Sequence, residues 1–381
     1  MFKYSFLISV FVVTVSCTNN RESGAASFIS SFSGAGMDSV NYLGDEKYVA
    51  YINPAFEPVN ESPWFSFAVS SESEISIEVT LDYGEYDHRY IPKLSSDKKS
   101  WKAINASKIK IDTVTGNAWL SLTVSSDTLY VAAQENTSSK DTYKWLDSVL
   151  TKNTFLKKEV AGKTVLGENN YVVTSNKHAR KSIVLIARQH PPEIPGGTIG
   201  FKSFYETLLS KSDVASKFRC RYNIIAFPLL NPDGADMGNW RHNAVGIDLN
   251  RDWIHFSQPE TKMVKSYMEK LERDKVDVEF AIDFHTSYSG PYMLVLDSLN
   301  EIETTKIIPK WIQNIEKTSA FKVETRRRSQ DLPYCYNYFY NEIGCEAVTY
   351  EEGDEIDRDI IKDRAKVYAN ELMKTLISIE N

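Results

Sequence analysis

Two histidines and several carboxylates follow dense apolar runs in the second half of the sequence. His190 and Glu193 lie in ARQHPPEIPGG (187–197), at the end of the run KSIVLIA, and His285 ends the run VEFAIDFH. Neutral imidazole nitrogens and carboxylate oxygens are ligands that Zn²⁺ binds well, and a set of two His and one Glu leaves a coordination position open for chemistry. These residue types therefore predict a catalytic zinc centre.

The spacing of His190 and Glu193 supports this prediction. Two prolines separate them, and proline fixes its backbone φ, which lowers the entropy lost when both side chains are held on one ion. A histidine at a strand end is more often a hydrogen-bonded structural residue than a metal ligand. That interpretation leaves the nearby Glu193 and the second histidine, His285, unexplained, so we prefer the metal site.

The candidate ligands follow predicted strands of an α/β region. From about residue 137 the sequence alternates strand-like apolar runs with helix-like amphipathic runs. This alternation predicts an α/β fold with a mixed, mostly parallel sheet flanked by helices. In such sheets ligands collect at the carboxyl ends of the strands. The predicted strands are 181–187, 222–230, 278–285 and 347–353, and the predicted helices are 140–152, 196–210, 259–274 and 359–379.

The segment before the α/β region has a β pattern. Residues 27–136 contain short runs that alternate apolar and polar residues, separated by Ser, Asp, Gly and Asn clusters, which predicts an all-β sandwich domain. His88 is isolated there, so we assign this domain no chemistry. QENTSSKD (134–141) is interpreted as a linker. The clearest predicted strands are 64–70, 75–81, 118–125 and 128–133.

Five short motifs carry a resemblance to a known family. ARQHPPE, NPDG, GIDLNRDW, DFH and VTYE occur in the order found in zinc metallocarboxypeptidases of the carboxypeptidase A superfamily. The resemblance covers residues 137–381 and is closest to the cytosolic carboxypeptidase branch, whose amino-terminal domain residues 27–136 resemble. It implies a carboxypeptidase-like fold and one Zn²⁺ ion held by His190, Glu193 and His285.

The resemblance also implies roles for residues around the metal. Asp248, in GIDLNR, matches the aspartate that accepts a hydrogen bond from His190 and fixes its tautomer. Glu351, in VTYE, matches the general base that takes a proton from the attacking water. Successive strand side chains point to opposite faces, so Glu352 is expected to be a solvated or structural charge.

Substrate-binding residues follow from the same motifs. Arg241, in GNWRHN, matches an arginine that stabilises the oxyanion, and Asn250 and Arg251 match the pair that holds the terminal carboxylate. The mobile tyrosine that caps the substrate in the family has no unique match. Tyr334 is our first choice because it precedes a predicted helix. The alternatives are Tyr336, Tyr338 and Tyr340.

The motifs predict a metallocarboxypeptidase that removes carboxy-terminal residues from peptides or from peptidoglycan stem peptides. Arg326, Arg327 and Arg328 form either a cationic specificity pocket for an acidic group or a solvated charge run. Two other functions remain open. One is a zinc amidase or esterase of the same fold, and the other is a non-catalytic peptide-binding lipoprotein.

The amino terminus and the charge indicate where the protein works. The apolar run within residues 1–17 is too short to span a bilayer and predicts an export signal. Cys17 resembles the lipid-modified cysteine of bacterial lipoproteins, with residues 18–26 as a tether, so we expect a periplasmic or outer-membrane lipoprotein whose membrane contact is the lipid. The alternative is an ordinary cleaved signal peptide. A net charge of -7 gives no reason to expect nucleic acid as a partner.

The remaining cysteines are Cys220, Cys335 and Cys345. Cys335 and Cys345 flank a predicted helix and could form a disulfide, which the sequence alone does not establish. The sequence contains no Cys-x-x-Cys pair, so we do not expect a thiolate metal site.

Overall fold

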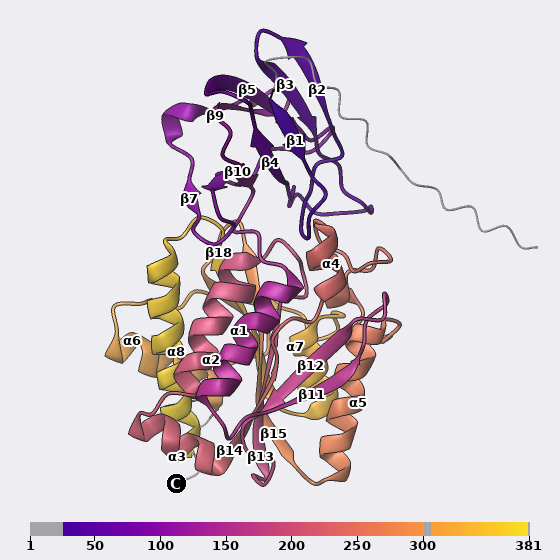
Figure 1. Cartoon of the computed structure of the whole chain (residues 1–381). Coiled ribbons are helices and arrows are strands. Elements are labelled where there is room, and N and C mark those ends of the chain that lie inside the picture. The colour runs from indigo at the N-terminus through magenta and orange to yellow at the C-terminus, as the bar shows by residue number, and fades with distance from the viewer. Residues whose placement is uncertain (1–25, 301–302, 304–305, 380–381) are drawn as a thin grey trace, which may run out of the picture.

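The computed structural model describes residues 26–300, 303 and 306–379. Figure 1 shows two parts, a β-rich region formed by residues 27–136 and an α/β region formed by the residues that follow. The predicted signal peptide, Cys17 and all of the predicted tether except Ala26 lie outside the described residues. Within the described ranges, no helix has the length and apolar character needed to cross a bilayer.

The β-rich region consists of two five-stranded sheets that share one core. In β9 the buried residues alternate with more exposed ones, as the sequence pattern predicts for a strand with one face in a core. One sheet has the order β1 (Ser27–Ile29), β4 (Ser66–Ser70), β10 (Leu129–Ala132), β6 (Lys93–Ser95) and β7 (Lys102–Ala103). The other has the order β2 (Ser39–Gly44), β3 (Lys47–Tyr51), β5 (Ile75–Asp82), β9 (Ala118–Val124) and β8 (Ile109–Ile111). The prediction of an all-β segment is confirmed.

The α/β region contains one eight-stranded sheet. Its central strands β14, β13, β15 and β18 run parallel, whereas β11, β12 and β16 introduce antiparallel pairs. This confirms the prediction of a mixed sheet. The order is β11 (Lys157–Lys163), β12 (Asn169–Thr174), β14 (Tyr222–Phe227), β13 (Lys181–Ala187), β15 (Asp277–Ser287), β18 (Glu346–Gly353), β16 (Tyr292–Leu296) and β17 (Thr325–Arg328).

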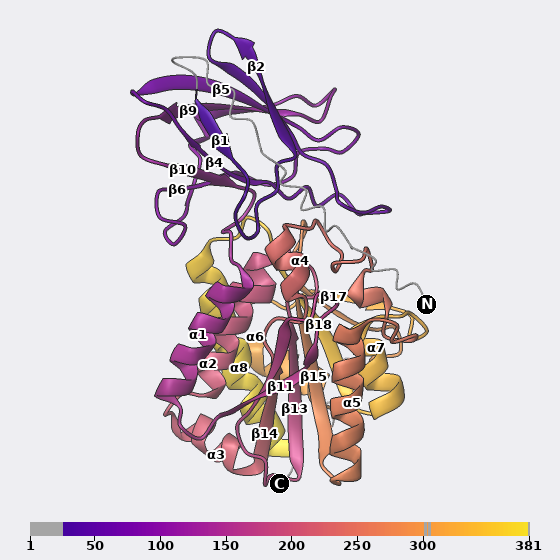
Figure 2. The same ribbon diagram turned by 45° about the vertical axis from the view of Figure 1, so that its right-hand side comes forward.

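Helices cover both faces of this sheet (Figures 1 and 2). One face packs against α1 (Ser139–Lys152), α2 (Phe201–Leu208), α3 (Asp213–Arg221), α6 (Ile307–Thr318) and α8 (Arg358–Ile379). The other packs against α5 (Pro259–Arg273) and α7 (Cys335–Tyr338). Side chains of β13 alternate between the two cores, because Ile183 and Leu185 face the first and Val184 and Ile186 face the second. Short helical segments complete the chain: η1 (Ala106–Lys108), η2 (Pro195–Gly200), α4 (Pro232–Met237), η3 (Leu249–Arg251) and η4 (Phe339–Ile343).

The segment predicted as a linker is held firmly between the two parts. Gln134 and Asn136 are buried, and the Asn136 amide donates to Ser66 Oγ at 3.0 Å. Ser138 and Asp141 form a capping box, so α1 begins at Ser139 inside the predicted linker. The polar composition of this segment predicted a linker, but these polar groups make hydrogen bonds to other parts of the protein instead of to water.

Three ion pairs join the β-rich region to the segment that follows β18. These interactions are largely shielded from water, which makes them stronger than ion pairs on the surface. They fix the position of the carboxyl end of β18 relative to the β-rich region. The pairs are Arg89 with Asp354 at 2.8 Å, Lys93 with Glu355 at 2.7 Å, and Arg358 with Glu135 at 2.8 Å.

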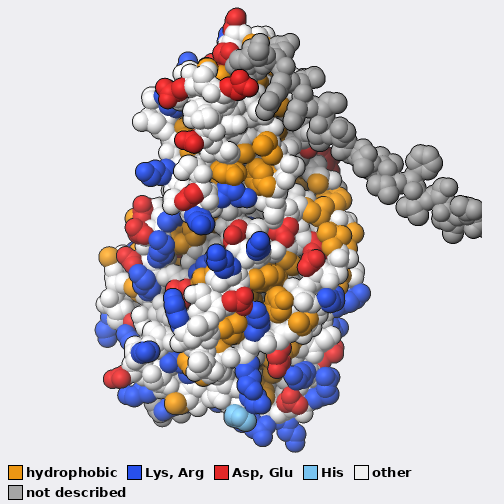
Figure 3. Space-filling model, viewed as in Figure 1, with side chains coloured by type: hydrophobic (Ala, Val, Ile, Leu, Met, Phe, Trp, Pro, Cys, Tyr) orange, Lys and Arg blue, Asp and Glu red, His pale blue; other side chains and the backbone are white. Residues whose placement is uncertain are grey.

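The cysteines form no disulfide in the described part of the chain. Cys335 and Cys345 are buried free thiols, and Cys220 is an exposed one. The pairing that the sequence left open is therefore not made. The face in Figure 3 shows basic and acidic side chains interspersed over both parts of the molecule.

His88 makes the stability of the β-rich region depend on pH. Its ring stacks on Phe65 with centroids 6.4 Å apart, and its Nδ1 lies 2.8 Å from the Tyr83 hydroxyl. Burial lowers the pKa of His88 from 6.5 to about 4. The folded state therefore binds the proton more weakly than the unfolded state, so this contribution to stability is complete above pH 6.5 and is lost as the pH falls toward 4.

We predict that His88→Gln, which retains a hydrogen-bonding group but cannot be protonated, reduces this acid sensitivity. Between about pH 7.5 and about pH 4.5 the variant should lose about 2 kcal/mol less unfolding free energy than the parent protein. Urea unfolding of both proteins at the two pH values measures the difference. An equal loss in both proteins would contradict the prediction.

Candidate metal centre and active site

Two neighbouring parallel strands deliver the candidate metal ligands to one edge of the sheet, and a third, β18, brings Glu351 beside them. β13 ends at Ala187, just before His190 and Glu193, and β15 carries His285. The register of β15 and β18 sets His285 directly opposite Glu351. Because the carboxyl ends of parallel strands reach the same edge, residues far apart in sequence converge there.

The turn after β13 is held by Arg188, a residue to which the sequence assigned no role. Arg188 has a positive φ of 59° and is buried. Its guanidinium donates to the Pro191 carbonyl at 2.7 Å and to Thr198 Oγ1 at 2.8 Å. These bonds tie the proline-containing turn to η2, so His190 and Glu193 are fixed before any ligand binds.

A glycine allows η2 to approach β15 closely. A Cβ atom on Gly196 would lie 1.7 Å from the carbonyl oxygen of His285, so any other residue would push the two segments apart. The Gly196 N–H also donates to Thr286 Oγ1 at 2.8 Å. The glycine thereby brings Glu193, two residues before η2, against His285.

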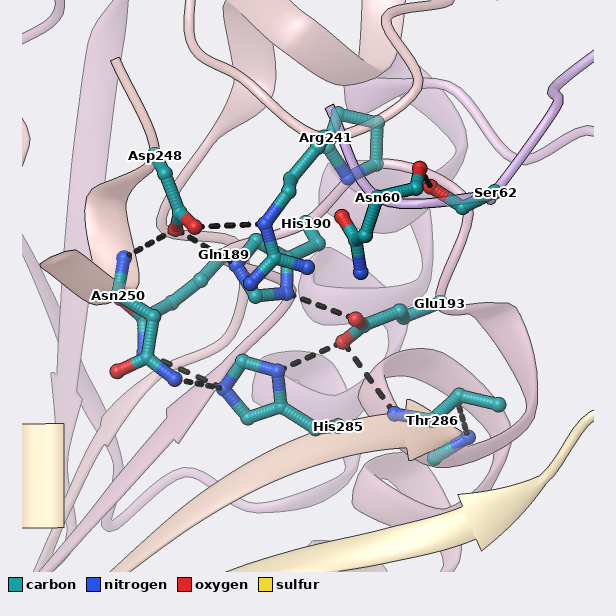
Figure 4. Close-up of polar contacts among 12 residues, drawn as sticks. Asn60, Ser62, Gln189, His190, Glu193, Arg241, Asp248, Asn250, His285 and Thr286 are labelled. Carbon is teal, nitrogen blue, oxygen red and sulfur yellow. Dashed lines mark hydrogen bonds and ion pairs between the residues drawn. The ribbon is translucent and has the colours of Figure 1, made fainter. Parts of the chain in front are cut away.

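His190, Glu193 and His285 form a compact cluster (Figure 4). Their candidate ligand atoms all lie within 4.8 Å of one another. Nδ1 of His190 is 2.7 Å from Glu193 Oε1, and Nδ1 of His285 is 2.7 Å from Glu193 Oε2. The sequence-predicted ligands are thus brought together, with both Nδ1 atoms directed at the carboxylate.

A carboxylate lies behind each histidine. His190 Nε2 is 2.9 Å from Asp248 Oδ1, and His285 Nε2 is 2.7 Å from Asp283 Oδ2. Carboxylates in this position fix the imidazole tautomer and raise its basicity, which leaves Nδ1 as the metal-binding atom. The sequence analysis assigned this role to Asp248 but missed Asp283, although it lies in the DFH motif. Strand position shows that Asp283 and His285 share a face.

The charges at the cluster fit a divalent cation. The carboxylates of Glu193, Asp248 and Asp283 surround the two imidazoles. Burial alone would raise the pKa of Glu193, but His190 and His285 hold that pKa well below its usual range. A bound cation would balance this concentration of buried negative charge. The nitrogen and oxygen donors are those that Zn²⁺ prefers.

Glu351 enters the cleft whereas Glu352 does not, as strand alternation predicts. Glu351 is buried, its Oε2 has no hydrogen-bond partner in the described chain, and burial raises its pKa to about 8. Glu352 faces the opposite side of the sheet, where it accepts hydrogen bonds from the Tyr350 hydroxyl and from Arg364 on α8. Glu352 is therefore a buried structural charge.

Three further predicted residues lie beside the cluster. Arg241 Nε donates to Asp248 Oδ2 at 2.6 Å, which holds the guanidinium over the site (Figure 4). Asn250 is buried, and its Oδ1 accepts a hydrogen bond from the Cys335 N–H at 2.9 Å, so only its NH₂ end faces the site. Arg251 is more exposed, and its side chain is 46% accessible.

The structure distinguishes among the candidate tyrosines and arginines. Tyr334 lines the same cleft, and the Arg251 guanidinium lies 4.4 Å from its ring centroid. Of the three consecutive arginines, Arg328 lines the cleft. Arg326 stacks on Tyr292, and Arg327 donates to two main-chain carbonyls. Tyr336 and Tyr338 are buried in the core, and Tyr340 is on η4.

The cluster lies in a cleft of about 300 Å³ that both parts of the chain form. The sequence analysis missed several residues of its wall. Tyr288 directly follows β15 and Tyr292 begins β16, and no motif marks them. Four more come from the β-rich region, to which the sequence assigned no chemistry: Asn60, Ser62, Arg89 and Tyr90.

The fold and the site together define a class of metal-binding proteins. In this class a mixed sheet flanked by helices carries two histidines and a glutamate at the carboxyl edge of its parallel strands. The chain belongs to the zinc carboxypeptidase family, whose model matches residues 142–377. Members of this family use a zinc ion, and the His190, Glu193 and His285 cluster has the donors to hold one.

Relatives and solved structures agree with the family. The chain is 30% identical over 223 residues to cytosolic carboxypeptidase 6 of Mus musculus, a match that covers 50% of this chain and 41% of the mouse protein. It is similar in fold to a metallo-carboxypeptidase from Burkholderia cenocepacia, with a TM-score of 0.75, 20% identity and coverage of 93% of this chain and 99% of that chain. A Pseudomonas aeruginosa metallo-carboxypeptidase in complex with (2-guanidinoethylmercapto)succinic acid gives a TM-score of 0.74 at 19% identity, with coverage of 93% and 99%.

We predict that replacing either outer carboxylate weakens metal binding without unfolding the protein. Asp283→Asn and Asp248→Asn should each lower zinc affinity by about 10- to 100-fold, because the imidazole loses its anionic partner. Competition with a chromogenic chelator measures the affinity. Asp277→Asn, at the exposed end of β15 opposite the site, is the matched control, and this variant should bind zinc as the parent protein does. Unchanged affinity in both aspartate variants would contradict the prediction.

Proposed function

We propose that the protein is a zinc-dependent exopeptidase that hydrolyses carboxy-terminal residues from peptides or from peptidoglycan stem peptides. The observation that carries this proposal is one cleft that combines the His190, Glu193 and His285 cluster with an accessible arginine, Arg251. When bound, zinc supplies Lewis acidity and lowers the pKa of water toward about 7. Arg251, exposed beside Tyr334, is available to a substrate carboxylate.

Glu351 is proposed as the general base. It lies opposite His285 on the neighbouring strand, and one of its oxygens has no partner in the described chain. A carboxylate in this position can take the proton of the attacking water and pass it to the departing amine. Burial raises its pKa and so makes the carboxylate a stronger base, and the positive charge of a bound metal ion beside it would favour the ionised form that accepts the proton.

Arg241 is proposed to stabilise the negative charge that develops on the scissile carbonyl. Its Nε is paired with Asp248, so the guanidinium is already oriented before the substrate binds. Preorganised donors of this kind need no rearrangement as charge develops. Asn250 and Arg251 are proposed to hold the terminal carboxylate, through the inward-facing amide of Asn250 and the guanidinium of Arg251.

The preference for a particular terminal residue and the cellular location are also proposals. Arg328 adds a positive charge to the cleft, which favours a substrate with an acidic side chain or a second carboxylate. The apolar run in residues 1–17 and the position of Cys17 support export as a lipoprotein. Stem peptides of peptidoglycan are then a substrate class within reach.

We predict that Arg251→Ala impairs hydrolysis chiefly for substrates with a free terminal carboxylate. The loss of a charge-assisted contact should lower kcat/KM on free peptides by at least about tenfold and leave the same peptides with an amidated terminus unaffected. Lys262→Ala, on the exposed side of α5, is the control for loss of a positive charge. Equal losses on the free and amidated peptides would argue for an amidase or esterase instead.

We predict that Glu351→Gln lowers kcat by about 100- to 10,000-fold while zinc affinity changes little, because the residue moves protons and does not hold the metal. Incubation of the zinc-loaded protein with a mixed peptide and muropeptide library, read by mass spectrometry, gives the cleavage products. Loss of one or a few terminal residues supports the proposal. Internal cuts would indicate an endopeptidase, and products that persist in the Glu351→Gln sample would exclude Glu351 as the base.

A further inference from the structure

The β-rich region forms one wall of the cleft. Asn60, Ser62, Arg89 and Tyr90 line it together with the metal cluster. Figure 4 shows the side-chain amide of Asn60 directed toward Arg241 and Glu193, whereas Asn250 lies on the other side of His190. Asn60 and Asn250 therefore face each other across the metal ligands.

The main chain that carries Asn60 is fixed to the α/β region. Ser62 Oγ donates to the Trp240 carbonyl at 3.0 Å, next to Arg241. Arg89 donates to the Glu61 carbonyl at 2.7 Å and pairs with Asp354 at 2.8 Å, three residues beyond Glu351. The segment is thus attached to the two pieces of chain that carry the proposed oxyanion-stabilising and general-base residues.

The Asn60 side chain is not used in holding this segment. It makes no hydrogen bond within residues 26–300, 303 and 306–379, although its carbonyl accepts one from Ser62 Oγ at 3.2 Å. An asparagine amide offers two donor hydrogens and an acceptor oxygen, which complement the C=O and N–H groups of a peptide main chain. Asn60 is exposed, so its amide is accessible to a ligand in the cleft while its main chain is held in place.

The direction in which a peptide must lie in an exopeptidase indicates which part of the substrate Asn60 contacts. If Asn250 and Arg251 hold the terminal carboxylate and the scissile carbonyl lies at Arg241, the residue that is released lies between these two positions. The chain on the amino-terminal side of the scissile bond must then leave past Glu193, on the side where Asn60 lies.

We propose that Asn60 hydrogen-bonds the main chain of the substrate on the amino-terminal side of the scissile bond, so that the β-rich region forms the upstream part of the substrate site. This inference rests on the proposed exopeptidase function. In the upstream part of the site the enzyme would recognise the main-chain amides of an extended peptide, and it would therefore tolerate many side chains. Asn60 would raise kcat/KM only for substrates that extend beyond the residues that flank the cleaved bond.

The experiment compares peptide pools of two and of four residues, mixed in sequence and with free carboxyl termini. Asn60→Ala should lower kcat/KM on the tetrapeptide pool by about tenfold, the effect of losing one or two main-chain hydrogen bonds, and change the dipeptide pool by less than about twofold. Asn41→Ala, at an exposed position of β2 away from the cleft, is the matched control and should change neither pool.

A second measurement separates binding from turnover. In the Glu351→Gln background, Asn60→Ala should weaken calorimetric binding of the tetrapeptide pool by about tenfold, with zinc affinity unchanged. A loss that is equal for both pool lengths, or no loss, overturns the role of Asn60. If Arg251→Ala still impairs hydrolysis of free-carboxyl peptides more than of amidated ones in that case, the exopeptidase proposal stands and this inference alone fails. If Arg251→Ala impairs both kinds of peptide equally, the exopeptidase proposal has failed.

Discussion

The parallel pairing of β13, β15 and β18 is the constraint on which the site depends. It brings three strand ends to one edge, and its register places His285 opposite Glu351. The alternation of side chains along a strand then decides which residues enter the cleft. The same alternation that sends Val184 and Ile186 into one core sends Glu352 to the face where α8 packs. Core packing and site geometry are therefore consequences of one register.

Electrostatics reinforces this geometry. Each histidine lies between Glu193 and an outer carboxylate, so the imidazoles are oriented from both sides. Burying this much negative charge is unfavourable without compensation. A divalent cation supplies that compensation, and binding of the ion to the folded state would also stabilise the fold. Arg188 already holds the turn after β13 in place, so binding of the ion causes little further loss of conformational freedom.

The β-rich region and the α/β region build the cleft together. Ion pairs such as Arg89 with Asp354 hold the chain that follows Glu351, and a hydrogen bond from Ser62 holds the chain that precedes Arg241. The region without catalytic motifs thus constrains residues on both sides of the metal cluster.

The sequence by itself determined the fold class, the strands that carry the site and the residue types of the metal cluster, because periodicity and the short HPPE and DFH motifs are local features. It could not reveal Asp283 as the partner of His285, nor Asn60 and Tyr292 as wall residues. Those assignments depend on strand register and on contacts between segments far apart in the chain, which leave no mark on local composition. Only the tertiary structure decided that Gln134, Asn136 and Ser138 in the predicted linker are buried, because their polar groups find partners that the sequence does not place nearby.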